Sequence, residues 1–125
     1  MIKIMQQGVV AQQFSHANLS TAAQGDLVVL VGNMQVDSAG AGRPIGVITT
    51  VSPLDGFVVV ELFAAQIREA IAGTGGVTAG AQIKLSAKNT VVAAVPGTTQ
   101  TDEPLAFGIA LNTVTAGGTV FYMPL

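Results

Sequence analysis

The sequence offers few side chains that could do acid–base, nucleophilic or metal chemistry. It contains one histidine, His16, and no cysteine, so a transition-metal site would need an unusual set of carboxylate partners. No serine lies in the Gly-x-Ser-x-Gly turn that exposes a catalytic hydroxyl, although five could be counted toward a triad: Ser15, Ser20, Ser38, Ser52 and Ser86. We therefore predict no catalytic residue, and an exposed or interface position for His16.

The acidic and glycine-rich segments are typical of turns and loops. Asp26 and Asp55 each lie beside a glycine at a predicted turn. Asp102 and Glu103 are adjacent in the chain, so their side chains do not converge as an acid–base pair would need. No calcium-loop spacing is present, and the Gly-rich segment 73–76 is not followed by the Gly-Lys-Ser/Thr of a phosphate loop. The sequence thus predicts no metal, no cofactor and no enzymatic activity.

Charge argues against nucleic acid and membrane partners. Only 10% of the 125 residues are charged, the net charge is −2, and the five basic residues are scattered along the chain. A phosphate-binding face needs clustered basic residues, and the longest apolar runs are too short to span a bilayer. No export signal is recognisable at the N-terminus, so we expect synthesis without export. Because so little charge protects poorly against self-association, we expect a surface used in contacts with copies of the chain or with a larger assembly.

Short β-branched runs alternate with turn residues along the chain, at intervals of about ten residues. This pattern predicts an all-β fold, either a small barrel or a jelly-roll-like sandwich. The predicted strands are 27–31, 45–51, 57–62, 82–85, 91–95, 105–112 and 119–123.

The segment 63–71 is ambiguous between a strand and a short helix. Phe63, Ile67 and Ile71 recur at helical spacing. A strand also fits the alternation, with Ile67, Glu69 and Ile71 on one face, but we expect that arrangement to place Glu69 inward.

The sequence carries a weak internal repeat. Ungapped shifts of 62 and 55 residues superpose similar segments: 44–48 on 106–110, 55–60 on 117–122, and 25–30 on 80–85. The difference of seven residues falls in 95–104, which we expect to be a longer loop in the second copy. We predict one β domain, residues 22–125, in which two units (22–62 and 77–125) pair around one core because each is too small to bury its own sheet face.

Four segments of the second half carry a family resemblance: 76–85 (GVTAGAQIKL), 90–93 (TVVA), 104–111 (PLAFGIAL) and 116–120 (AGGTV). Together they resemble the capsid decoration, or cement, proteins of tailed bacteriophages. The first half resembles them more loosely, through 25–29 (GDLVV) and 44–47 (PIGV), so the resemblance covers about four fifths of the chain. It departs from the family pattern before residue 25 and over 63–71.

The resemblance implies a small β-barrel or jelly-roll-like domain on the outer surface of an expanded phage head. Such a protein bridges major capsid subunits, acts as a homo-oligomer (a trimer rather than a dimer), and needs no cofactor. A tail or receptor-recognition module is the alternative, although it is expected to carry an exposed aromatic cluster. An enzyme of a compact β-trimer type is a third class, for which the acid and base motifs are missing.

Within this hypothesis, residues 1–21 form a polar contact arm or a first edge strand. Its alternation could let the arm add to a sheet edge of a neighbouring protein. The candidate contact residues are Gln6, Gln7, Val9, Gln12, Gln13, Phe14 and His16. We predict that deletion of residues 1–15 abolishes capsid binding and leaves the remaining domain folded.

Overall fold

The computed structural model of the chain describes residues 10–38, 41–64, 66–95 and 105–125. Within these ranges the chain forms ten β-strands and one short 3-10 helix, η2 (Leu19–Thr21), and no α-helix. The prediction of an all-β fold is confirmed, and the strands close into barrels rather than into a sandwich.

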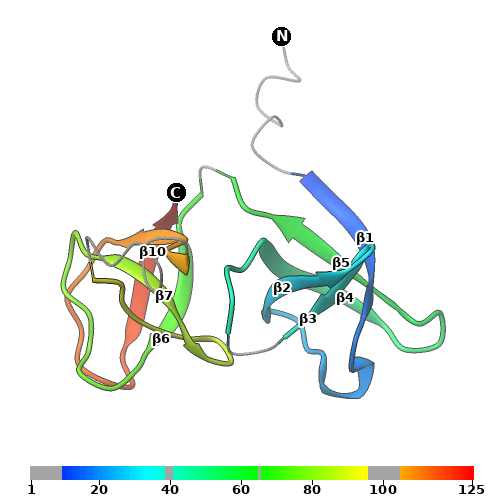
Figure 1. Ribbon diagram of the computed structural model, residues 1–125, viewed down its shortest axis with the longest axis horizontal. Helices are drawn as coiled ribbons and strands as arrows, with labels where there is room; N and C mark the ends of the chain where they lie inside the picture. Colours follow the sequence, from blue (N-terminus) through cyan, green and yellow to red (C-terminus); the bar gives the residue numbers. More distant parts are fainter. Residues whose placement is uncertain (1–9, 39–40, 65, 96–104) are drawn as a thin grey trace, which may run out of the picture. The chain divides into compact units, whose positions relative to one another are not determined.

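The first barrel, called barrel 1 below, is closed by five strands (Figure 1). Its order around the ring is β1-β3-β2-β4-β5, where β1 runs parallel to β3 and every other pair is antiparallel. The strands are β1 (Val10–His16), β2 (Leu27–Gly32), β3 (Gln35–Asp37), β4 (Gly46–Ser52) and β5 (Phe57–Leu62).

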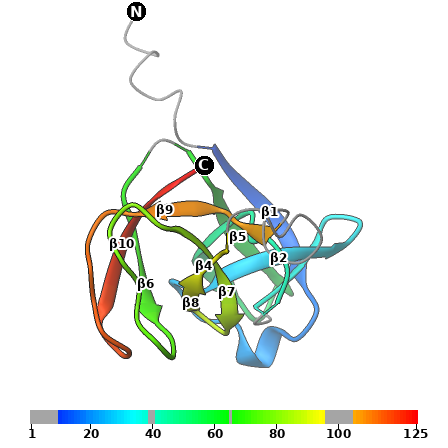
Figure 2. The same ribbon diagram turned by 60° about the vertical axis from the view of Figure 1, so that its left-hand side comes forward.

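The second barrel, barrel 2, repeats this plan with the next five strands (Figure 2). Its ring order is β6-β8-β7-β9-β10, again with one parallel pair, β6 and β8. The strands are β6 (Arg68–Ala72), β7 (Gln82–Ala87), β8 (Thr90–Ala93), β9 (Gly108–Ala110) and β10 (Thr119–Pro124).

The two barrels share their ring order and strand register, which confirms the repeat seen in the sequence. The register irregularity between Leu30 and Gly32 on β2 recurs, at a shift of 55, between Leu85 and Ala87 on β7. Matched backbone hydrogen bonds recur at shifts of 55 and 62: Ile45 N–H to Val28 O (2.9 Å) with Phe107 N–H to Ile83 O (3.0 Å), and Gly25 N–H to Ile48 O with Gly80 N–H to Ala110 O (both 2.8 Å). The longer segment of the second copy lies between β8 and β9, where residues 96–104 are outside the described residues.

Two matched glycines show why both copies need the same small residue at the start of a strand. A Cβ on Gly46, which begins β4, would collide with the backbone carbonyl of Glu61 on β5. A Cβ on Gly108, which begins β9, would lie 2.8 Å from the Tyr122 ring and 3.1 Å from the Met123 carbonyl oxygen on β10. Close approach of neighbouring strands therefore requires glycine at both positions.

Each barrel encloses apolar side chains of its own. In barrel 1 the fully buried cluster comprises Phe14, Val28, Val36, Ile48, Val58 and Val60. In barrel 2 the largest buried side chains are Phe107, Tyr122 and Ile83, and the rings of Phe107 and Tyr122 meet edge to face at 5.4 Å. The chain divides into two compact units, Met1–Ala39 with Pro44–Ala65 and Gly40–Arg43 with Gln66–Leu125.

This differs from the predicted pairing of two β units around one shared core. When five strands close into a ring, one face of the sheet becomes the interior of the barrel. Each unit can therefore bury that face without packing against the other unit. The premise that each unit is too small to bury its own sheet face does not hold for a closed sheet.

The ambiguous segment resolves as a strand over β6, and the expected inward position of Glu69 is wrong. Ala70 and Ala72 are buried, whereas Glu69 and Ile71 are exposed. Because successive side chains of a strand point to opposite faces, Ile67, Glu69 and Ile71 lie on the outer face. The carboxylate that made a strand look unfavourable therefore remains in solvent.

Candidate functional site

Four of the seven predicted contact residues lie on β1, which is a barrel strand. Gln12 and Gln13 are exposed, whereas Phe14 and His16 are buried at 6% and 8% exposure. The other three, Gln6, Gln7 and Val9, lie outside the described residues. Strand β1 pairs with β5 from Val10 to Ser15, so these described residues belong to barrel 1 itself.

This pairing contradicts part of the deletion prediction. Removal of residues 1–15 would take away most of β1 together with the buried ring of Phe14, which packs in the barrel 1 core. A ring of strands that loses one member exposes two edges and opens its core. The remaining domain is therefore not expected to stay folded as a whole.

A shallow hollow on barrel 1 brings the predicted contact residues together with two turns far along the chain. The β2–β3 and β4–β5 turns lie on either side of β1 at this point, because Ser15 pairs with Phe57 on one side and with Gln35 on the other. We call this hollow the β1 hollow; its lining residues are Gln12, Gln13, Phe14, Ser15, Asn33, Met34, Asp55, Gly56 and Phe57.

Met34 is the unusual residue of the β1 hollow. Its φ angle is 51°, in the left-handed region that costs an ordinary L-residue free energy, and its apolar side chain is 52% exposed. The backbone carbonyl of Met34 accepts hydrogen bonds from Ser15 N–H (2.9 Å) and Ser15 Oγ (3.3 Å), which hold the turn against β1. The matched turn of barrel 2 holds Asn89 in the same conformation, so the exposed apolar side chain is what distinguishes Met34.

The β1 hollow is polar and suited to hydrogen bonding rather than to catalysis. Amide groups of Gln12, Gln13 and Asn33 line it together with the Asp55 carboxylate. Asp55 Oδ2 accepts a hydrogen bond from Ser52 Oγ at 2.8 Å, so this acid also holds its own turn. Polar side chains around one or two apolar contacts are typical of surfaces that bind a folded protein partner. The sequence predicted the turn at Asp55, but not that this turn would lie beside β1.

The histidine and one serine meet inside barrel 1, in an arrangement that does not activate the serine. His16 Nε2 lies 2.8 Å from Ser38 Oγ, and His16 Nδ1 accepts a hydrogen bond from the backbone N–H of Asn18 at 2.9 Å. Because a backbone N–H can only donate, Nδ1 carries no proton, and in the neutral ring Nε2 carries it. Nε2 therefore donates to Ser38 Oγ and is not a base toward it. His16 is a buried structural residue, contrary to the exposed or interface position expected for it.

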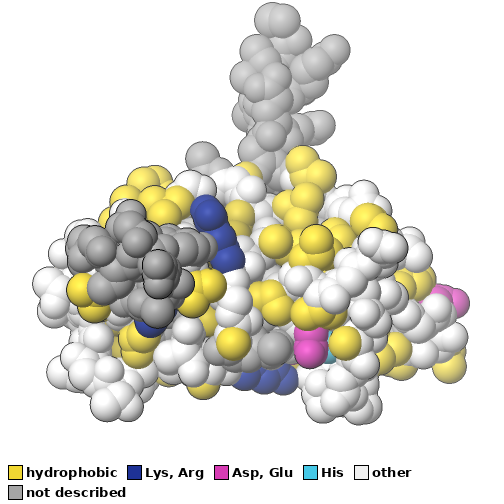
Figure 3. All heavy atoms as spheres, viewed as in Figure 1, with side chains coloured by type: hydrophobic (Ala, Val, Ile, Leu, Met, Phe, Trp, Pro, Cys, Tyr) yellow, Lys and Arg dark blue, Asp and Glu magenta, His cyan; other side chains and the backbone are white. Residues whose placement is uncertain are grey.

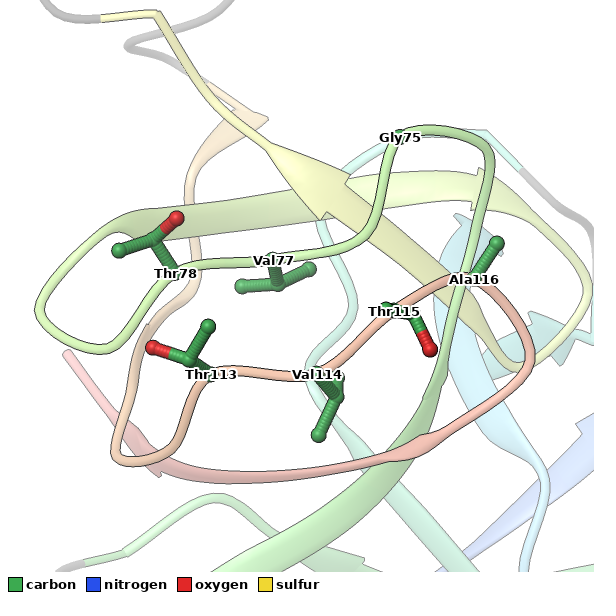
Figure 4. A pocket seen from close by; sticks show the side chains of 7 residues that line it. All are labelled: Gly75, Val77, Thr78, Thr113, Val114, Thr115 and Ala116. Atoms are coloured by element: carbon green, nitrogen blue, oxygen red, sulfur yellow. The ribbon is translucent and has the colours of Figure 1, made fainter.

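A second hollow lies on barrel 2, between the loop after β6 and the loop before β10 (Figure 4). Val77 and Val114 join the two loops by a pair of backbone hydrogen bonds, each 2.9 Å. Thr113 Oγ1 accepts a further bond from Ala79 N–H at 2.9 Å. The hollow is lined by Gly75, Val77, Thr78, Thr113, Val114, Thr115 and Ala116. None of these side chains ionises, so this hollow has no acid, base or anion-binding group of its own.

The remaining buried ionisable groups have structural roles. Asp26, at 3% exposure, accepts a hydrogen bond from Ala23 N–H at 3.0 Å and closes the turn before β2. Burial raises the pKa of the Tyr122 hydroxyl well above its ordinary range, and the nearby Arg68 charge acts in the opposite direction. No group of three His, Cys, Asp or Glu side chains that could hold a metal ion occurs among the described residues. No helix in the described part of the chain is long and apolar enough to cross a membrane.

Comparison with known proteins gives a structural relative. No protein-family model matches the chain, and no curated protein matches it either. Among solved structures, the chain is similar to the head fiber gp8.5 N base of bacteriophage phi29. The TM-score is 0.60 at 17% sequence identity, over 94% of this chain and 94% of that one. At this identity the likeness shows a shared fold.

Proposed function

We propose that this chain is a structural protein of a phage virion that binds the outer surface of the assembled head. In this proposal it bridges major capsid subunits, stabilises the shell as a decoration protein, and acts as a homo-oligomer, a trimer rather than a dimer. It is not an enzyme and uses no cofactor, nucleic acid or membrane.

The observation that carries the proposal is the likeness to the phi29 head fiber N base over nearly the whole length of both chains. Both barrels and their connection are therefore included in the match, rather than one common β unit. The segments that resemble decoration proteins, such as 76–85 and 104–111, support a head-associated protein by a separate route.

The β1 hollow supports a protein partner and supplies the contact site of the proposal. Its amide groups and the exposed Met34 side chain offer hydrogen bonds around an apolar contact. A single contact of this kind binds weakly. An oligomer that engages several capsid subunits at once gains affinity through effective concentration, and a ligand of the assembled lattice alone stabilises that lattice by linkage.

The first test is the genomic neighbourhood, which we expect to contain scaffold, protease and major capsid genes. The direct test is to mix the purified protein with heads of that phage that lack it, then to measure occupancy and the temperature at which the heads release DNA. We expect saturable occupancy and a higher release temperature. Absence of occupancy would overturn the decoration proposal, and binding to tails or host cells instead would favour a receptor-recognition module.

The contact site is tested with Met34→Lys and a matched control, Asn89→Lys. These residues occupy equivalent turn positions with φ angles of 51° and 57°, so the backbone effect of the substitution is matched. We expect Met34→Lys to weaken head binding at least about tenfold, the loss of roughly 1.4 kcal/mol that one good apolar contact supplies, and Asn89→Lys to bind as the parent does. Equal binding by both variants would exclude the β1 hollow as the contact.

A further inference from the structure

We infer that the outer face of β6 and β10 is the surface through which this chain associates with a second copy of itself. The inference rests on the proposed function in one respect, because it assigns the homo-oligomer of that proposal to a particular surface. The face is defined by five exposed side chains: Ile67, Ile71, Phe121, Met123 and Leu125.

The register of barrel 2 makes this face continuous. Phe121 lies opposite Glu69, and Ile71 opposite Thr119, on paired strands. The same antiparallel register reaches Tyr122 opposite Arg68, and one further residue sets Ile67 opposite Met123, which also pairs with Ile109 on β9. Side chains at alternate positions of adjacent strands contact one another, so the apolar residues form one patch rather than isolated points.

The five exposed side chains form a patch on the scale of the largest apolar patch of a typical monomer, which is often functional. Ile67 is 66% exposed, Leu125 56%, and the other three between 41% and 45%. Together they present several hundred Å², the scale at which apolar patches mark interaction sites. That is a large share of the about 800 Å² that each partner buries in a standard interface. In Figure 3, hydrophobic side chains likewise reach the surface at many points, and charged ones are few.

Barrel 1 shows that the fold does not require this patch. The positions equivalent to Ile67, Ile71 and Met123 hold Ala11, Ser15 and Glu61 on the same strands of the other ring. The positions equivalent to Phe121 and Leu125 hold Val59 and Phe63, so barrel 1 keeps two of the five apolar positions. The continuous five-residue apolar face is a property of barrel 2.

A second copy of this chain is the occupant that the chemistry favours. Permanent interfaces between identical subunits are more apolar than interfaces with partners that fold and act separately. Among the described residues of this face Glu69 is the one charge, and a further copy is the one partner certain to present an equally apolar surface. The polar β1 hollow has the opposite character and suits a partner met after folding. The two barrels thus offer two different kinds of interface.

The test uses Phe121→Lys with Val59→Lys as its matched control. The lysine introduced by Phe121→Lys would lie across from Glu69, and this opposite-charge pair does not destabilise the fold of the separate chain. In an oligomer the same lysine would place an ammonium group in an apolar interface, which weakens association. Val59 is the equivalent position of barrel 1, opposite Gln13. Sedimentation equilibrium over the micromolar range measures the association of the full chain, and circular dichroism confirms that each variant is folded.

We expect the parent chain to be oligomeric, Phe121→Lys to weaken association at least about 100-fold, and Val59→Lys to leave it unchanged. Ile67→Lys, which lies before β6 and perturbs no strand, serves as a second variant with Ala11→Lys as its control. A monomeric parent, or association unaffected by both barrel 2 variants, would overturn the inference. So would equal weakening by the barrel 1 controls.

Binding to heads separates this inference from the proposed function. A monomeric Phe121→Lys protein that still occupies heads, with lower affinity because multivalency is lost, supports both. An oligomeric parent that never occupies heads would support the self-association surface and exclude the capsid role. A monomeric parent that occupies heads would exclude the self-association surface and assign the apolar patch to the capsid contact. The proposed capsid role would stand.

Discussion

Barrels 1 and 2 share one topology and one register, yet they fill it with different side chains. Barrel 1 places its large buried ring on the first strand, at Phe14, where barrel 2 has Ala70. Barrel 2 places its large ring on the last strand, at Tyr122, where barrel 1 has Val60. The five strands of a barrel define its interior volume. Either the first or the last strand of the barrel can supply the aromatic side chain that fills this volume.

The outer surfaces differ more than the interiors do. Barrel 1 carries a polar hollow around Gln13 and a strained turn at Met34, whereas barrel 2 carries exposed Phe121 and Ile71. A duplicated fold keeps the glycines and register that closure requires, because their loss would open the ring. Outer positions are free of that constraint, so they are where two copies of one fold can acquire two functions.

The largest expected effect comes from deletion of residues 1–15. It removes β1 from the ring, so we expect barrel 1 to lose its structure while barrel 2, which contains none of these residues, keeps its own. Amide hydrogen exchange on β2–β5 and on β7–β10 measures the two barrels separately. Deletion of residues 1–9 alone leaves β1 in place and is the control. Protected amides throughout β4 and β5 after the longer deletion would show that a barrel of this kind tolerates an open ring.

The second effect compares the two large buried rings. Phe14→Ala introduces the residue that barrel 2 has at the equivalent position, Ala70. Barrel 1 has Val60 on β5 where barrel 2 has the aromatic Tyr122, so the substitution leaves a cavity. We expect a loss of about 3–5 kcal/mol from the free energy of unfolding of barrel 1. Urea titration followed by NMR of barrel 1 amides measures it. The double variant Phe14→Ala, Val60→Tyr imports both choices of barrel 2, and recovery of stability there would confirm that the two positions share one volume.

A smaller effect is expected at the buried hydrogen bond that barrel 2 lacks. Ser38→Ala leaves the Nε2–H of buried His16 without its acceptor, which we expect to cost about 1–3 kcal/mol. The equivalent positions of barrel 2 are Ala72 and Ala93. In a His16→Ala background the cost of Ser38→Ala should shrink by at least about 0.5 kcal/mol, since the donor is gone. An unchanged cost in both backgrounds would mean that the bond does not contribute.

The smallest effect is an exchange between two matched turns. Met34 and Asn89 hold equivalent left-handed positions, and asparagine adopts this conformation more readily than methionine. We expect Met34→Asn to stabilise barrel 1 by about 0.5–1 kcal/mol and Asn89→Met to destabilise barrel 2 by a similar amount. Thermal unfolding measured side by side for the two variants gives the comparison. Shifts of the same sign would show that side-chain contacts, rather than backbone strain, decide the preference.

The strands that the sequence predicted best are runs rich in β-branched and other apolar residues with turn residues at both ends. Residues 57–62 form β5 with the predicted bounds, and 27–31 and 82–85 form most of β2 and β7. The predicted strand 105–112 is only Gly108–Ala110, and β3 was not predicted at all. Such short strands carry too few residues to show alternation, and their neighbours in the ring hold them in place.

The candidate site was predictable only in part. Gln12, Gln13 and Phe14 were predicted contact residues and do border the β1 hollow, but the Phe14 side chain is 6% exposed and packs in the barrel 1 core. His16 is buried and does not line the hollow. Phe14 is a single aromatic residue in a polar N-terminal stretch, so from the sequence it resembles a contact residue. Its inward position can be deduced only when β1 is known to be a barrel strand. Met34 and Asp55 were not predicted to contribute, since each is brought to β1 by pairing with a strand distant in the chain.

By itself, the sequence determined the all-β class, most strand positions and the duplication. These follow from local properties: short β-branched runs bounded by turn residues, and glycines whose backbone needs recur at fixed spacing. Only the tertiary structure decided that each unit closes into its own barrel, that Glu69 faces solvent and that His16 is buried. The physical reason is that strand partners are chosen by hydrogen bonds between distant segments, and the choice of partners determines which face becomes the inside.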